Sequence, residues 1–293
     1  MKKPEFLIIG AQKCGTTWLW EMLKQHPGTD LPERKEIHFF GSAELYRNGK
    51  DWYYSHFQGL NPSKLTGEAS TTYFFDRVPY WHNPSDKLEF DAGLAPIPDL
   101  VTKELPEVKV IIMLRDPVKR ALSAFKHLIR VRLLSPTKSL RKAAVQLPKK
   151  RILSYGLYAR YIRLWLQYVP AERMKVLVFE EDVIRHSEKT LADVYGFLGL
   201  DTSFRPTGTS KSVNKSMGWT ELVLSYYGRD LAKRFLKKNN VSPLLSRIDP
   251  FLGPFLIGDK DIEFLRDYFL PMKGELEELL GRSLDCWDYG RKR

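Results

Sequence analysis

The chain has 293 residues, enough for one large α/β domain or two small ones, with an ample core in either case. Its net charge of +12 favours anionic partners, and its two cysteines, Cys14 and Cys286, argue against a disulfide framework. No apolar run reaches membrane-spanning length. We therefore expect a soluble cytoplasmic protein, or one of the Golgi lumen if the sequence is part of a longer membrane-anchored chain.

The first predicted elements are a strand, a loop and a helix at the N-terminal end. Residues 6–9 form an unbroken run of bulky apolar side chains, which is typical of a strand buried on both faces. Gly10 and Gly15 allow a tight turn, and apolar residues at helical spacing from Thr17 onward predict a helix that ends at Pro27. The N–H groups at a helix start and the helix dipole favour bound anions, so this unit predicts a phosphate site.

The loop sequence Gly-Ala-Gln-Lys-Cys-Gly-Thr-Thr distinguishes two kinds of phosphate site. Its glycines have the Walker A spacing, but that motif places lysine directly after the second glycine. Here Thr16 holds that position, and Lys13 lies inside the loop. The loop instead resembles the 5′-phosphosulfate loop of sulfotransferases, which binds 3′-phosphoadenosine 5′-phosphosulfate (PAPS). This resemblance implies that the donor is bound by Lys13, Cys14, Gly15, Thr16, Thr17 and Trp18.

Residues 31–40 follow and contain Lys35-Glu36-Ile-His38-Phe-Phe, whose alternating apolar end predicts a short strand or strand edge. The segment resembles the catalytic segment of the heparan sulfate sulfotransferases, in which the glutamate is the general base. The resemblance implies that Glu36 takes the proton of the acceptor. His38 would share a face with Glu36 on a strand, and would orient the acceptor or act as the base itself.

The rest of the chain up to residue 200 alternates strands with helices. Strands are predicted within 67–75, 108–114 and 175–179, and helices within 98–105, 118–134, 158–169 and 191–198. This order predicts an α/β fold: a parallel sheet flanked by helices, with ligands bound at the carboxyl ends of the strands. The resemblance implies a P-loop-like sulfotransferase fold in one domain, 1–293. Its donor-binding core is 5–200, and its mainly helical C-terminal region, 201–293, serves the acceptor or closes the site.

A second phosphate motif follows the strand at 108–114. There Arg115-Asp-Pro with Ser123 resembles the 3′-phosphate site of sulfotransferases, and both side chains are suited to donate hydrogen bonds to phosphate oxygens. The resemblance extends the donor site to Tyr155 and to Lys215 with Ser216, where the family has Lys-Gly.

Residues 117–171 contain thirteen Lys or Arg and no Asp or Glu. Most of these cations are expected to form a solvated face, but the lack of acids predicts a positive surface beside the active site. Such a surface would suit a glycan, a glycolipid or an acidic membrane that the protein touches peripherally. Nucleic acid is not expected, because no nucleic-acid-binding motif is found. Gly41 and Ala69 stand where 3-O-sulfotransferases have Asp and Lys at the acceptor side, so the resemblance does not identify the acceptor.

The leading hypothesis is a PAPS-dependent sulfotransferase that acts on a hydroxyl or amine of a carbohydrate or glycolipid. Transfer would be in line, with Glu36 as general base and without a metal. Lys13 would stabilise charge on the bridging oxygen as 3′,5′-adenosine diphosphate (PAP) leaves. One alternative is a P-loop nucleotide kinase or NTPase, which Thr16 and the Arg115-Asp116 pair oppose. Another is a non-catalytic module that binds anionic glycans. The sequence carries no signal for an oligomeric state.

Overall fold

The computed structural model describes residues 2–80, 89–209, 218–228, 249 and 257–287. A four-stranded parallel sheet lies at its centre, with strand order β2-β1-β3-β4. The strands are β1 (Phe6–Gly10), β2 (Gly67–Ala69), β3 (Lys109–Leu114) and β4 (Met174–Val178). Since every strand runs in the same direction, the loops that follow β1, β3 and β4 leave the sheet at one edge, where ligands bind in such folds.

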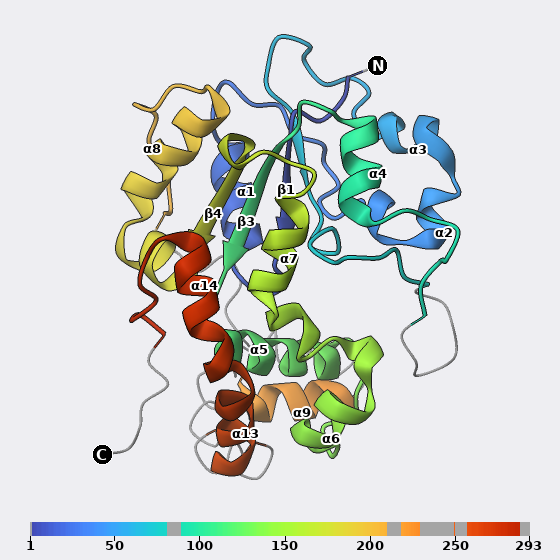
Figure 1. Ribbon diagram of the computed structural model, residues 1–293, viewed down its shortest axis with the longest axis vertical. Coiled ribbons are helices and arrows are strands. Elements are labelled where there is room, and N and C mark those ends of the chain that lie inside the picture. The colour runs from blue at the N-terminus through green and yellow to red at the C-terminus, as the bar shows by residue number, and fades with distance from the viewer. Residues whose placement is uncertain (1, 81–88, 210–217, 229–248, 250–256, 288–293) are drawn as a thin grey trace.

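Helices cover both faces of this sheet, as Figure 1 shows: α1 lies behind it and α7 in front. The helices that lie on these two faces or beside the sheet are α1 (Thr16–Lys24), α2 (Ala43–Tyr46), α3 (Gly49–Ser55), α4 (Ile97–Glu104), α7 (Tyr158–Trp165), α8 (Ser187–Leu198) and α14 (Lys273–Leu280). Beyond its carboxyl edge lie α5 (Pro117–Arg130), α6 (Leu140–Gln146), α9 (Trp219–Tyr227) and α13 (Asp259–Phe269). No described helix is both long and apolar enough to span a bilayer.

Two hydrophobic clusters hold these layers together. The larger one surrounds the sheet, and every residue of β1 is buried, as the unbroken apolar run predicts. The smaller one joins α5, α6, α9 and α13 through side chains such as Phe125, Leu140, Leu222 and Leu265. The carboxyl edge of the sheet therefore lies next to a separately packed helical layer.

The predicted parallel sheet with flanking helices is confirmed, but the predicted strand within residues 31–40 is wrong. Glu36 and His38 have left-handed backbone angles, with φ of 66° and 63°, and the chain then forms a 3-10 turn, η1 (Phe39–Gly41). The apolar alternation has another cause, because Phe39 stacks on Tyr53 with ring centroids 4.6 Å apart. Tertiary aromatic packing, rather than sheet pairing, buries this segment.

Helix boundaries differ from the predictions by a few residues. The helix predicted within 118–134 ends at Arg130, and Arg132 has a left-handed φ of 61° that helices do not tolerate. The helix predicted within 158–169 ends at Trp165. Lys215 and Ser216, predicted as donor-binding, lie outside the described residues.

Candidate active site

The loop after β1 is shaped around two left-handed residues, Lys13 with φ 69° and Gly15 with φ 93°. A Cβ on Gly15 would lie 2.5 Å from the Phe179 ring, so a side chain has no room there. Gly15 is also the N-cap of α1, and no side chain caps this helix. The N–H groups of its first turn, at Thr16 and Thr17, are consequently available to an anion.

Positive charge is concentrated around this loop. Burial first, and then the charges of Arg130 and Arg115, lower the pKa of the Lys13 ammonium from its ordinary value, while Glu36 raises it. Within the described part of the chain, no hydrogen bond or ion pair engages that ammonium. A group placed among like charges in this way is suited to a polyanion such as a phosphate or phosphosulfate.

Arg115 extends the positive site on the other side of the loop. Its Nη1 donates to the Lys13 carbonyl at 3.4 Å, and its guanidinium lies over the Phe179 ring, 5.4 Å from the centroid. Its Nε is buried without a hydrogen-bond partner, 3.8 Å from the Glu180 carboxylate. A buried donor that lacks an acceptor is costly, so this group fits an additional anionic ligand.

Ser123 lies on the face of α5 that also carries His127 and Arg130, one and two turns further along. Arg130 donates to His127 Nδ1 at 3.1 Å. Burial, together with the charges of Lys13 and Arg130, lowers the pKa of His127 to about 4, so its imidazole is neutral at neutral pH. Sequence reasoning missed His127 and Arg130, although their helical spacing from Ser123 was a usable signal.

Glu36 and His38 form the polar centre opposite the loop. Lys35 Nζ lies 3.0 Å from Glu36 Oε1, while Glu36 Oε2 accepts from the backbone and side chain of Thr71, both at 3.2 Å. His38 Nε2 lies 3.4 Å from Glu36 Oε2, and its Nδ1 lies 3.0 Å from Thr72 Oγ1. Burial is the main cause that lowers the pKa of His38, which favours a neutral ring.

Lys35 joins this centre to the loop, a role that sequence reasoning also missed. Its ammonium donates to Thr17 Oγ1 at 3.2 Å as well as to Glu36. Glu36 is also close enough to Lys13 to act on its pKa. The structure therefore brings the predicted residues Lys13, Thr17, Glu36 and His38 into one site.

Three other predicted donor-binding side chains have partners inside the protein. Cys14 is buried with its Sγ 3.5 Å from the Tyr158 hydroxyl, and burial raises the pKa of the thiol to about 11. Trp18 Nε1 donates to the Thr209 carbonyl at 2.9 Å. The buried Tyr155 hydroxyl is hydrogen-bonded to Arg151. Direct contact of these side chains with a donor stays a prediction.

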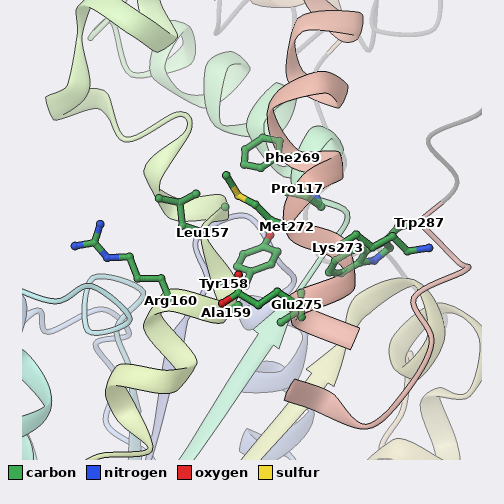
Figure 2. Close-up of a pocket in the computed structure, with 12 residues that line it drawn as sticks. Pro117, Leu157, Tyr158, Ala159, Arg160, Phe269, Met272, Lys273, Glu275 and Trp287 are labelled. Atoms are coloured by element: carbon green, nitrogen blue, oxygen red, sulfur yellow. The ribbon is translucent and has the colours of Figure 1, made fainter. Parts of the chain in front are cut away.

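A mostly apolar cavity of about 220 Å³ lies near this site, between α7, α14 and the turn before α14 (Figure 2). Tyr158 lines it, and the hydroxyl of that residue donates to the Arg115 carbonyl at 2.8 Å. Trp287, on another wall, donates to Glu180 Oε2 at 3.0 Å. The residues that line the cavity include none of the predicted donor-binding or catalytic residues, and Tyr158 links its wall to the Arg115 backbone.

Comparison with known proteins decides the family. The family model described as "Sulfotransferase domain" matches residues 3–217, a range that holds the loop, Glu36, His38 and Arg115. The chain belongs to the sulfotransferase family. Members of this family are enzymes that use PAPS as the sulfate donor, so this chain is a sulfotransferase.

Individual relatives agree with this assignment. The chain is 27% identical over 290 residues to heparan sulfate glucosamine 3-O-sulfotransferase 5 of Homo sapiens, covering 96% of this chain and 73% of that protein. It is 30% identical over 304 residues to bifunctional heparan sulfate N-deacetylase/N-sulfotransferase 3 of Homo sapiens, covering 97% of this chain and 31% of that longer protein.

A solved structure also resembles this sulfotransferase along its whole length. It is a sulfotransferase from Alicyclobacillus acidocaldarius, with 26% sequence identity and a TM-score of 0.66. The match covers 98% of this chain and 99% of that one. The predicted P-loop-like sulfotransferase fold is thereby confirmed.

Proposed function

We propose that this sulfotransferase moves the sulfuryl group from PAPS to a hydroxyl or amine of a carbohydrate or glycolipid by in-line transfer, with Glu36 as general base. The observation that carries the proposal is that the Lys35 ammonium donates to both Thr17 of the donor loop and Glu36, because a base and an anion site are then within one centre. The P-loop kinase alternative lacks such support, because Walker A requires a lysine directly after the second glycine and this loop has Thr16 there.

The donor would be held at two places. The first-turn amides of α1 and the Lys13 ammonium would bind the 5′-phosphosulfate, and Arg115 with Ser123 would bind the 3′-phosphate. The buried, unpartnered Nε of Arg115 and the uncapped start of α1 support this division. The donor supplies the sulfuryl group, and the protein's part is to orient it and to neutralise its charge.

Glu36 fits the role of base better than His38. Both ring nitrogens of His38 lie within 3.4 Å of a partner, Nδ1 beside Thr72 and Nε2 beside Glu36. Glu36 Oε1 contacts Lys35 but, as a carboxylate oxygen, keeps a second lone pair for the acceptor proton. The Glu36 side chain is 29% exposed, against 19% for His38. The acceptor oxygen or nitrogen would bond to sulfur while the bond from sulfur to the bridging oxygen breaks. The acceptor proton would pass to the Glu36 carboxylate.

Lys13 and Lys35 have separate roles in this proposal. The Lys13 ammonium would face the negative charge that grows on the leaving PAP. Lys35 would couple the two halves of the site, since it contacts both Thr17 of the donor loop and Glu36. No step requires a metal ion.

The acceptor is proposed from the surface around the site and from the relatives. Arg130, Arg132 and Lys142 are exposed in the acid-free stretch, which suits an anionic glycan. The two relatives named above act on heparan sulfate, as their names state. Gly41 is required here because a Cβ would lie 2.1 Å from Thr72 Oγ1, which contacts His38. The acceptor side is therefore built differently from a site with Asp at that position.

Isothermal titration with PAP in the absence of metal, beside 5′-AMP and magnesium-ATP, tests the donor half of the proposal. We expect tight binding of PAP and a large loss for 5′-AMP, which lacks the 3′-phosphate. Preference for magnesium-ATP would overturn the proposal. Transfer from PAPS to desulfated heparan-type glycans then tests the acceptor half, and PAP binding without transfer to any glycan would favour a non-catalytic binding module.

A further inference from the structure

A buried carboxylate that the proposed reaction does not use lies behind the base segment. Glu68, on β2, is completely buried. Its Oε2 accepts from the Tyr53 hydroxyl at 2.7 Å, and its Oε1 accepts from the Tyr73 hydroxyl at 2.8 Å and from Ser70 Oγ. Three hydroxyl donors thus converge on one carboxylate, an arrangement suited to its ionised form.

This cluster is joined directly to the base segment. Ser70 Oγ, whose own proton is donated to Glu68, accepts from the backbone N–H of His38 at 2.9 Å. One residue earlier, the Ala69 carbonyl accepts from the backbone N–H of Glu36 at 3.0 Å. Glu36 and His38 both have left-handed backbone angles, which non-glycine residues keep only where surrounding contacts hold them.

We propose that Glu68 is a positioning residue: its carboxylate orients the Ser70 hydroxyl and thereby holds Glu36 and His38 in the geometry needed for proton transfer. This inference rests on the proposed role of Glu36 as base. Glu68 touches neither donor nor acceptor, so it acts on the turnover step rather than on donor affinity.

Protonation of Glu68 would disturb this arrangement. A protonated carboxyl adds a fourth hydroxyl proton to a cluster in which Ser70, Tyr53 and Tyr73 already donate, so one of them must turn away. Burial and, to a smaller extent, the charge of Glu36 raise the pKa of Glu68, and the three hydroxyl donors lower it, with a net increase to about 6. Turnover is therefore expected to fall as the pH drops through about 6, while PAP affinity does not follow.

Single-turnover rates as a function of pH for Tyr53→Phe and Tyr54→Phe test the proposal. Tyr53→Phe removes a hydrogen bond that lowers the pKa of Glu68, so the acid limb of the profile should move to higher pH. Tyr54→Phe is the matched control, because this neighbouring hydroxyl is hydrogen-bonded to Glu104 instead. It should leave the acid limb in place.

Glu68→Gln gives a second, independent readout. A neutral amide cannot accept all three hydroxyls, and we expect turnover to fall about tenfold to a hundredfold at every pH, with unchanged PAP affinity and no step near pH 6. If this variant does not fold, the pH profile of Tyr53→Phe still tests whether Glu68 positions the base segment.

Two outcomes would overturn the inference: superimposable pH profiles for Tyr53→Phe, Tyr54→Phe and wild type, or a wild-type rate for Glu68→Gln. An acid limb that Tyr53→Phe does not move would then belong to a group other than Glu68. Failure of the proposed function looks different, because Glu36→Gln would then keep full turnover.

Discussion

The donor loop and the base segment face one another but are built in opposite ways. Around the loop, the Lys13 ammonium has no partner among the described residues, and the buried Nε of Arg115 lacks a hydrogen bond. In the base segment, Glu36 and His38 are held by contacts to both backbone and side chains. The difference indicates that the loop is complementary to an anion it must bind, whereas the base is already oriented before binding.

The largest effect on turnover is expected from a substitution in the base segment, which is oriented before the ligands bind. Glu36→Gln removes the proton acceptor but keeps the size of the side chain, so single-turnover transfer should fall by about 10²- to 10⁴-fold, with PAP affinity unchanged. Glu33→Gln, an exposed acid in the same segment, is the control and should retain the wild-type rate. A wild-type rate for Glu36→Gln would transfer the role of base to His38.

A substitution on the donor side of the site should instead reduce the affinity for PAP. Arg115→Ala removes a charged donor to the proposed 3′-phosphate, a contact worth about 1.5–3 kcal/mol, so PAP affinity should fall roughly tenfold to a hundredfold. The affinity for 5′-AMP should change much less, because that ligand lacks the 3′-phosphate. Lys24→Ala, at the exposed end of α1, is the control in the same titration. Equal losses for PAP and 5′-AMP would contradict the assignment of Arg115.

A smaller effect should appear in the pH dependence of donor binding. Burial and neighbouring cations lower the pKa of Lys13, so this ammonium loses its proton at lower pH than an ordinary lysine. An anionic ligand favours the charged form, so PAP binding should take up protons and weaken severalfold as the pH rises through that lowered pKa. Calorimetry in buffers of different ionisation enthalpy measures the uptake, and Lys13→Arg should abolish it. Proton release on binding would contradict this interpretation.

The two halves also differ in how far the sequence predicts them. The loop is local: an apolar strand, two glycines, Lys13 and a helix start lie within a dozen residues, so the short-range pattern was sufficient. The strands β3 and β4 were likewise predicted from unbroken apolar runs, whereas residues 67–75 were predicted as a strand that runs into a loop. Arg130 escaped notice because its charge acts on Lys13 only in the folded chain, and His127 because its lowered pKa depends on burial and on these same two cations.

The base segment depends on long-range contacts, which a local pattern does not contain. Its residue types identified Glu36 and His38, but their geometry comes from Ser70, Ala69 and Thr72, more than thirty residues further along the chain. The apolar alternation there predicted a strand, and aromatic packing replaced it. Glu68 gave no signal as a positioning residue, because its role appears only when β2 brings it beneath this segment.

The smallest effect concerns stability, and it separates a ligand-binding cation from a structural one. Lys13→Met keeps the apolar stem but removes a partly buried charge that neighbouring cations repel. The free protein should therefore gain about 0.5–1 kcal/mol of unfolding free energy, or roughly 1–4 °C in Tm. Because the folded-state pKa of Lys13 is lowered, this gain should be complete at neutral pH and shrink as the pH rises toward the ordinary lysine value.

Saturating PAP should reverse the order of the two proteins. Wild type would gain the free energy of ligand binding, and Lys13→Met would gain much less, since its affinity is reduced. Melting both proteins with and without PAP gives all four values in one experiment. A lower Tm for Lys13→Met in the absence of PAP would show that Lys13 stabilises the empty fold. The charged groups of the loop would then be stabilised by the protein before any ligand binds, as those of the base segment are. The proposed difference between the donor loop and the base segment would be contradicted.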